Sequence, residues 1–215
     1  MCIKYNTCFR NNFVEIETQI ILGEDNSKYL SPMIINGIIV DTDGFEVLSI
    51  EQSENYTVDQ LKIFDYEIKN KAYILKNYNL KTIIPINIYD RINNKSCFEN
   101  LIIEMNNHNN ETIKKLELFD KEIIVDNFDL LGAFEKLFEN VKENYMIKIC
   151  AICKKSSWHP YGGIDFFNHL CFKEFAKEYY KMNTKDKMNI LSLMDKNAGK
   201  YKNVYLTSFC NEYEE

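Results

Sequence analysis

The 215-residue chain is poor in the residues that build phosphate-binding loops and nucleic-acid contacts. It has seven glycines, three prolines and one tryptophan, and among its 26 basic residues only Arg10 and Arg91 are arginines. So few glycines leave little room for a Gly-rich phosphate loop, and the sequence contains no such loop, no nucleophile elbow and no His-Glu-x-x-His motif. Phosphate and base recognition relies on the bidentate guanidinium group. The sequence therefore argues against a nucleic-acid partner.

Long apolar runs are also lacking. The longest, residues 33–40, is broken by Asn36 and Gly37 and is too short to span a bilayer. The opening stretch, MCIKYNTCFRNNFVEIE, has no continuous apolar core of the kind that a secretion signal needs. We therefore predict a cytoplasmic protein without membrane contacts. In a reducing compartment, its seven cysteines are not expected to form a disulfide framework.

The net charge of −6 is unevenly distributed along the chain. Residues 1–145 hold 15 Lys and Arg against 24 Asp and Glu, a net charge of −9, whereas residues 146–215 hold 11 against 8, a net charge of +3. An acidic amino-terminal part can keep a protein soluble, and it can also attract a basic protein partner.

Hydrophobic residues make up 46% of the chain and aromatic residues 13%, which is ample for a packed core. Alternating apolar and polar residues between positions 12 and 127 predict a series of strands, with a hairpin at Asn36-Gly37. Pro85 cannot donate a ladder hydrogen bond, so we expect it at a sheet edge or a bulge. Residues 128–144 carry apolar side chains at helical spacing and predict one long helix.

After residue 145 the pattern changes again. Residues 172–181 and 185–196 each have apolar residues three and four apart, which predicts two helices, with Thr184 as a cap for the second. We therefore predict an α+β protein: an amino-terminal antiparallel β-sandwich or sheet with one long helix, then a helical carboxyl-terminal segment. The expected regions are 1–145 and 146–215, packed together as one unit.

A cysteine segment dominates the carboxyl-terminal region. Cys150 and Cys153 are two residues apart, Cys171 follows a Pro-Tyr-Gly-Gly turn, and Cys210 stands near the end. A C-x2-C pair directs two sulfurs to one point and supplies half of a tetrahedral metal site. The sequence therefore predicts a structural Zn²⁺ ion held by these four cysteines, which would fasten the helical segment to the rest of the protein.

Other interpretations of the same segment remain open. His159 or His169 could replace Cys210 as a ligand, or the cysteines could be ordinary reduced core residues. The Cys150–Cys153 pair could form a redox disulfide, although such motifs usually open a helix and this one precedes a loop. A catalytic zinc would keep one position open for water, with His159 or Asp165 as the general base.

At these residues the chain resembles an uncharacterised bacterial family, a domain of unknown function. Members of that family carry a C-x2-C pair, an aromatic-Ser-Pro-Tyr-Gly turn, a Cys-Phe pair and a late cysteine before an acidic-aromatic tail. Here these features read CAIC, SSWHPYGG, CF at Cys171, and TSFCNEYEE, and the resemblance covers roughly residues 75–215. The chain departs from the pattern at IDFFNH and stops soon after Cys210, where members continue with a basic tail. The resemblance implies four metal-binding cysteines and no activity.

These observations favour a non-enzymatic cytoplasmic protein that binds another protein, as an immunity-like or regulatory partner does. The alternatives are a zinc- or thiol-dependent enzyme that uses the Cys150–Cys171 loop, and a nucleic-acid-binding zinc module. The last would need a lysine stripe beside exposed Trp158 and Tyr161.

Overall fold

The computed structural model describes residues 3–22, 31–42, 45, 47–108, 111–125, 130–150, 153–158, 169–182 and 186–204. Most of this part of the chain is antiparallel sheet, in sheets of seven, five and three strands. The chain divides into two compact units, residues 1–85 with 99–141, and residues 86–98 with 142–215. Residues 86–98 thus group with the carboxyl-terminal unit, which was expected to begin only after residue 145.

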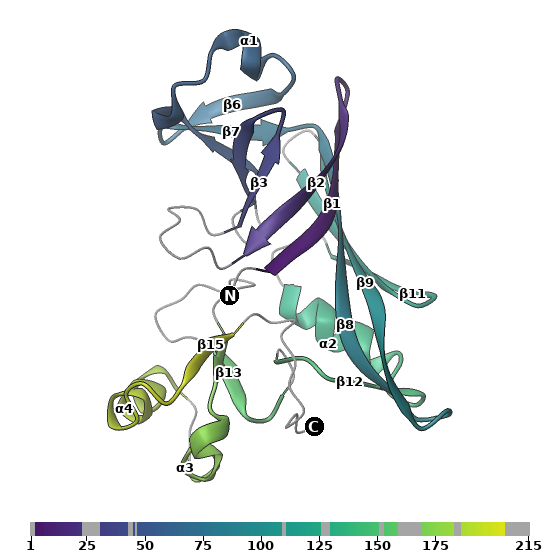
Figure 1. The fold of residues 1–215 in the computed structure, drawn as a ribbon, viewed down its shortest axis with the longest axis vertical. Coiled ribbons are helices and arrows are strands. Elements are labelled where there is room, and N and C mark those ends of the chain that lie inside the picture. The colour runs from purple at the N-terminus through teal and green to yellow at the C-terminus, as the bar shows by residue number, and fades with distance from the viewer. Residues whose placement is uncertain are drawn as a thin grey trace. The chain divides into compact units, whose positions relative to one another are not determined.

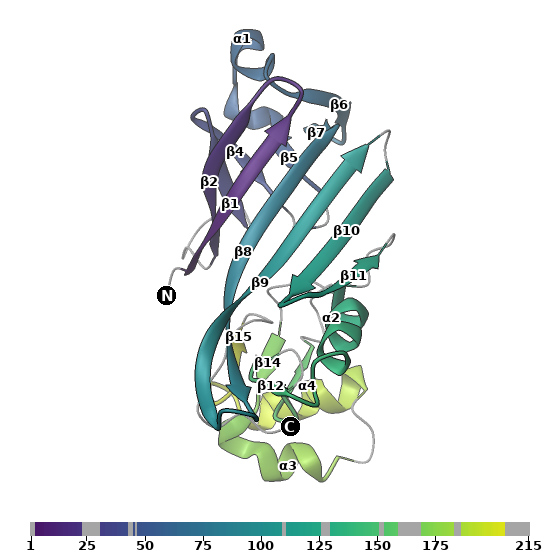
Figure 2. The ribbon, with the colours of Figure 1, turned by 90° about the vertical axis from the view of Figure 1, so that its right-hand side faces the viewer.

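The seven-stranded sheet has the order β11-β10-β9-β8-β1-β2, and β12 also pairs with β8 (Figure 2). Burial alternates along β8, where every second residue from Tyr78 to Asp90 is buried and the residues between them are half-buried or exposed. The strands are β1 (Ile3–Asn11), β2 (Glu15–Leu22), β8 (Tyr78–Asp90), β9 (Lys95–His108), β10 (Glu111–Leu118), β11 (Lys121–Val125) and β12 (Tyr145–Ile147).

The five-stranded sheet has the order β3-β4-β5-β7-β6. Its first hairpin turns at Asn36 and Gly37, both with positive φ (50° and 78°), as the sequence predicted. The strands are β3 (Pro32–Ile35), β4 (Ile38–Asp41), β5 (Ser49–Glu51), β6 (Asp65–Lys69) and β7 (Ala72–Lys76), with η2 (Gln52–Glu54) and the single-turn α1 (Val58–Leu61) between β5 and β6.

These two sheets share the core of the first unit. The Thr18 hydroxyl on β2 donates to the Ile34 carbonyl oxygen on β3 at 2.8 Å, so the two strands lie side by side (Figure 1). Phe9 on β1 meets Phe64 edge to face, with ring centroids 5.9 Å apart. Aromatic contacts of this kind add to the stabilisation that apolar burial provides.

Pro85 lies between two hydrogen-bonded ladders on one side of β8. Pairing with β1 ends at Ile83, and pairing with β12 begins at Ile88. Proline therefore leaves no ladder donor missing, although β8 itself is an interior strand of the sheet. Pro85 itself thus lies at an unpaired position, as expected, but its strand is not an edge strand. The boundary between the two units falls directly after this proline.

The prediction of one long helix over residues 128–144 is wrong. Helix α2 runs from Leu130 to Glu139, and residues 140–144 form turns. The chain leaves the helix because the next residues pair elsewhere: the Asn144 carbonyl accepts from Arg91 N–H, and β12 then joins β8. No helix in the described part of the chain is long and apolar enough to cross a membrane.

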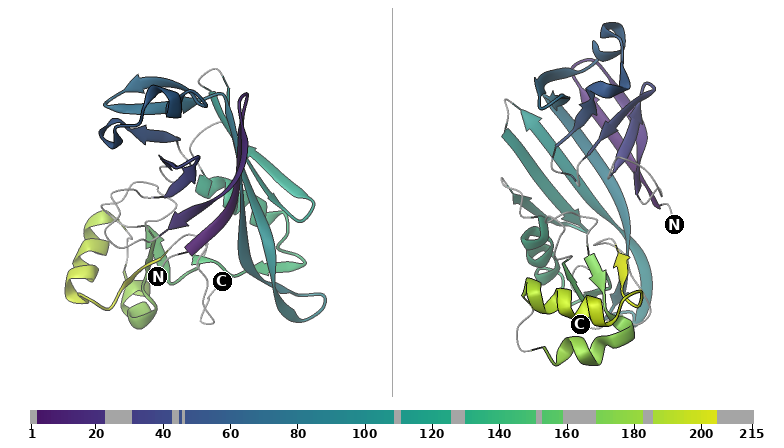
Figure 3. Two further views of the ribbon diagram at one scale, coloured as in Figure 1. Left: turned by 45° about the horizontal axis from the view of Figure 1, so that its top comes forward. Right: turned by 90° about the vertical axis from the view of Figure 1, so that its left-hand side faces the viewer.

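The prediction of a helical carboxyl-terminal segment is also wrong. This region contains a three-stranded antiparallel sheet, β13 (Ser156–Trp158), β14 (His169–Cys171) and β15 (Lys202–Val204), in the order β13-β14-β15. Its helices are short: η4 (Lys173–Phe175), α3 (Ala176–Tyr180) and α4 (Lys187–Lys196) (Figure 3). They close a small core over the sheet, made of Leu170, Phe172, Phe175, Tyr179, Ile190, Leu193 and Met194. The described fold is therefore mostly antiparallel β.

Candidate metal centre

The C-x2-C pair forms a compact turn directly after β12. The Cys153 N–H donates to the Cys150 carbonyl oxygen at 3.3 Å, and the Ser156 N–H donates to the Cys153 carbonyl oxygen at 3.0 Å. The Ser156 hydroxyl lies within hydrogen-bonding distance of both carbonyl oxygens, at 2.8 Å from that of Cys153. One side chain therefore holds the two ends of the turn together.

The same serine connects the turn to the third cysteine. Ser156 lies directly opposite Cys171 in the β13–β14 ladder, and the Phe172 N–H donates to the Lys155 carbonyl oxygen at 2.8 Å. Tyr179, from α3, donates its hydroxyl to the Ser156 carbonyl oxygen at 3.0 Å. The backbone segments that carry the three cysteines are thus neighbours, although 17 residues separate Cys153 from Cys171.

Between Cys171 and Cys210 the chain leaves the three-stranded sheet and then rejoins it. Helices α3 and α4 leave after β14, and β15 comes back to pair with β14, with Lys202 opposite Cys171. The final described residue, Val204, is six positions before Cys210. A long chain interval at this place is therefore compatible with a short distance in space.

The described residues contain three of the four predicted ligands. Cys150, Cys153 and Cys171 are 7%, 9% and 9% exposed. Cys210 and the rival residues His159, Asp165 and Tyr161 lie outside the described part of the chain, while Trp158 and His169 are described by their backbone alone. Within the described residues, no three or more His, Cys, Asp or Glu side chains are grouped so as to hold a metal ion.

The donor set nevertheless suits zinc. Three buried thiols on adjacent backbone segments are soft ligands of the kind that Zn²⁺ and Fe–S clusters select, and C-x2-C spacing is common to zinc ribbons and knuckles. After Cys153 the chain makes a turn and enters β13, so this cysteine does not open a helix. The pair thus differs from redox motifs in which a helix dipole stabilises the thiolate.

Cys8 and Cys97 are half-buried thiols on β1 and β9, separate from the candidate centre. Burial raises the pKa of the Cys8 thiol, and the Glu17 carboxylate beside it raises that pKa further. Since the thiolate is the form that reacts or binds metal, this environment keeps Cys8 protonated. Cys8 and Cys97 can therefore serve as control positions when the cysteines of the candidate centre are substituted.

Ser156 is the residue of this centre that sequence reasoning missed. Its signal was present in the spacing: a serine three residues after Cys153 can return its N–H and hydroxyl to the Cys153 carbonyl. The two serines in KKSSW were instead interpreted as loop residues.

No protein-family model, no curated protein and no solved structure matches this chain. The resemblance of the cysteine segment to a bacterial family therefore stays a prediction, and the function has to be argued from the residues themselves.

Proposed function

We propose that the protein is a non-enzymatic protein-binding protein with a structural Zn²⁺ ion held by Cys150, Cys153, Cys171 and Cys210. The observation that carries the metal site is the position of Ser156, which ties the C-x2-C turn to the strand of Cys171. Four thiolates would close the coordination shell of the ion and fasten the end of the chain to this small sheet.

The protein-binding part of the proposal is supported by charge. Counted over the two compact units, the first carries 12 Lys and Arg against 22 Asp and Glu, a net charge of −10. The second carries 14 against 10, a net charge of +4. A net negative charge of this size speeds the encounter with a basic partner. Added salt screens the charge and weakens this attraction.

Metal analysis tests the zinc site. Protein purified without chelator should contain about one zinc ion per chain, and Cys→Ser changes at each of the four positions should lower that content and the melting temperature. Cys97→Ser is the matched control, and it should keep the metal. Replacement by Co²⁺ gives a second readout, because the intensity of the thiolate-to-cobalt absorption reports the number of sulfur ligands. The site would be refuted if the wild-type protein contains little zinc, or if none of the four substitutions lowers its zinc content.

Partner capture tests the binding function. The zinc-loaded chain, immobilised and exposed to proteins of its native host, should retain a basic protein at low salt and release it at high salt. The purified partner should then bind with measurable affinity by calorimetry. A partner that binds equally at both salt concentrations would contradict the electrostatic argument, and repeated failure to find any partner would contradict the function.

A further inference from the structure

Strand β11 ends the seven-stranded sheet, and no strand in the described part of the chain lies on its outer side. A two-residue turn at Phe119 and Asp120 joins it to β10, with Leu118 opposite Lys121. In such a hairpin, hydrogen-bonded and non-hydrogen-bonded residue pairs alternate. Residues of the non-hydrogen-bonded pairs direct their N–H and C=O groups away from the partner strand. Glu122 and Ile124 therefore direct their N–H and C=O groups off the open edge. Within the described chain, no residue pairs with them on that side.

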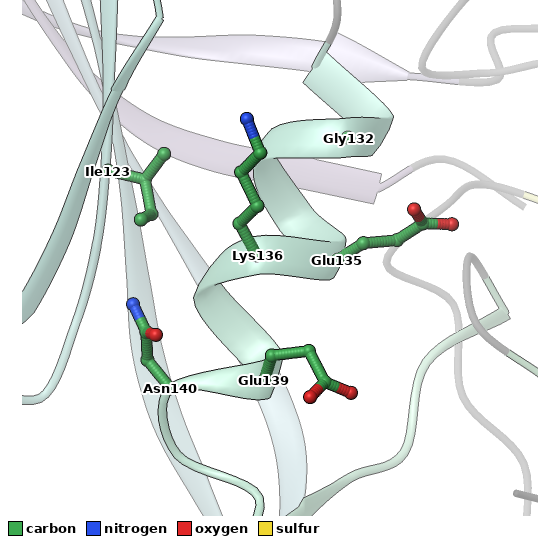
Figure 4. Close-up of a pocket in the computed structure, with 6 residues that line it drawn as sticks. All are labelled: Ile123, Gly132, Glu135, Lys136, Glu139 and Asn140. Carbon is green, nitrogen blue, oxygen red and sulfur yellow. The ribbon is translucent and has the colours of Figure 1, made fainter.

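A hollow of about 670 Å³ lies beside this edge, between β11 and α2 (Figure 4). Ile123 forms the strand side, Lys136 extends from the side of α2 that faces Ile123, and Asn140 lies just after the end of the helix. Gly132 and Lys136 are four residues apart on one face of α2, and Asn140 directly follows the helix.

The walls of this hollow are firmly held. Ala133, Phe134, Leu137 and Phe138 of α2 are buried, and the helix packs on β10 and β11. Ile124, by contrast, is 64% exposed on the outer face of the sheet. A strand added beside β11 would cover Ile124 with its outward side chains and fill the hollow over Ile123 with its inward ones.

We propose that the β11 edge and the hollow beside α2 bind an extended basic segment of the partner protein, which adds to the sheet as a further strand. Main-chain hydrogen bonds to Glu122 and Ile124 would supply affinity, and alternate side chains in the hollow would supply selectivity. Charge argues for a basic segment, since the unit carries a net charge of −10 and the lining holds two carboxylates against the one ammonium group of Lys136. The carboxylates of Glu135 and Glu139 extend from the side of α2 away from Ile123 (Figure 4). This inference rests on the proposed protein-binding function and names its surface.

A labelled peptide of about ten alternating Lys and Val residues is a suitable probe, because it is basic and favours an extended conformation. We expect fluorescence anisotropy to show binding to the wild-type chain. Two control peptides should bind at least about tenfold more weakly: one with Glu in place of Lys, and one N-methylated at alternate residues so that it cannot donate to the edge.

Ile124→Pro is the matched protein variant. It removes an N–H that faces the open edge and no hydrogen bond to β10, so the sheet can keep its ladder. Circular dichroism and the melting temperature check the fold, and zinc content should not change. We expect the Lys–Val peptide to bind this variant at least about tenfold more weakly than the wild type. The N-methylated peptide gives the same test on the unaltered protein.

The surface is refuted if the Lys–Val peptide fails to bind, or binds wild type and variant equally, or tolerates N-methylation. It is also refuted if sedimentation shows a dimer that Ile124→Pro abolishes, because a second copy would then occupy the edge. In each case, retention of the captured partner can still be compared between the wild-type chain and Ile124→Pro. Equal retention of that partner would leave the proposed function standing while removing this surface from it.

Discussion

The Ser156 hydroxyl oxygen lies 2.8 Å from the carbonyl oxygen of Cys153 and donates a hydrogen bond to it. The same residue pairs across the ladder with Cys171. A turn that carries two candidate ligands is thus fixed to the strand that carries a third before any metal is considered. In the proposed zinc site this connection would hold the two backbone segments together, while the three thiols in the described part of the chain are not themselves grouped as metal ligands.

Ser156→Ala should loosen this turn. Loss of one part-buried hydrogen bond typically costs about 1 kcal/mol of stability, and we expect a loss of that size in urea unfolding of the zinc-loaded protein. Zinc should also transfer several-fold more readily to a competing chelator, because the Cys150–Cys153 turn is less ordered. Ser156→Thr keeps the hydroxyl and should behave like the wild type. A variant with unchanged stability and zinc retention would show that the contact is incidental.

The cysteine spacing predicts a shared ligand shell, which stays a prediction, and it could not predict the small sheet on which Cys171 lies. Sequence intervals show which residues can share a ligand shell, whereas β13, β14 and β15 have only three residues each. Strands so short have no readable alternation. The apolar residues of α3 and α4 were visible at helical spacing, and they suggested a helical segment, because β13 and β14 left no signal; the stretch that begins with β15 did suggest a short final strand.

Asp186 is the N-cap residue of α4. Its carboxylate accepts from the Asn189 N–H at 2.9 Å, and Thr184, the cap that the sequence suggested, lies outside the described residues. Asp186→Ala should lower stability by about 1 kcal/mol, measured as a fall in melting temperature. Asp186→Asn keeps the acceptor and should restore most of it. Asp195→Ala, at an exposed position near the other end of the helix, is the control; an equal loss there would argue against capping.

The length of α2 illustrates a second limit of sequence patterns. Val141 fits the apolar stripe of the helix and is buried, yet it follows the last helical residue, Glu139. The residues after it leave the helix because Asn144 and β12 pair with β8 and its turn, far away in sequence. Periodicity records which side chains face the core, and it does not record where a distant strand competes for the backbone.

Glu104 joins two lysines on the outer face of the large sheet. Its carboxylate oxygens lie 3.5 Å from the Lys81 ammonium and 3.4 Å from that of Lys115. Burial lowers the pKa of Lys115, but Glu117 and Glu104 together outweigh this effect and the pKa is raised. Glu104→Gln should cost up to about 1 kcal/mol at low salt and less at high salt. Glu15→Gln, in the exposed pair with Arg10, should cost nothing measurable, and equal, salt-independent losses would contradict this account.

Tyr78 carries a buried hydroxyl that makes no well-formed hydrogen bond among the described residues, although the Leu48 backbone acts on its ionisation. The residue is 4% exposed, and its ring stacks on Phe9 at a centroid distance of 6.2 Å. Replacing a buried unsatisfied hydroxyl by hydrogen removes its desolvation cost and keeps the ring packing. Tyr78→Phe should therefore leave stability unchanged or raise it by up to about 1 kcal/mol in urea unfolding. A loss of more than this would reveal a partner for the hydroxyl.

The same substitution should change the response to alkaline pH. Burial raises the pKa of Tyr78 far above its ordinary value of about 10, against a smaller opposing effect of the Leu48 backbone. Above that ordinary value the unfolded chain loses the proton while the folded chain keeps it, so this residue makes stability fall as pH rises, by about 1.4 kcal/mol per pH unit. Tyr78→Phe removes this contribution, and its advantage over the wild type should grow above pH 10 at about that rate. Tyr73→Phe, at a half-buried ring on β7, provides the comparison, and parallel pH profiles for Tyr78→Phe and the wild type would show that the hydroxyl ionises in the folded protein.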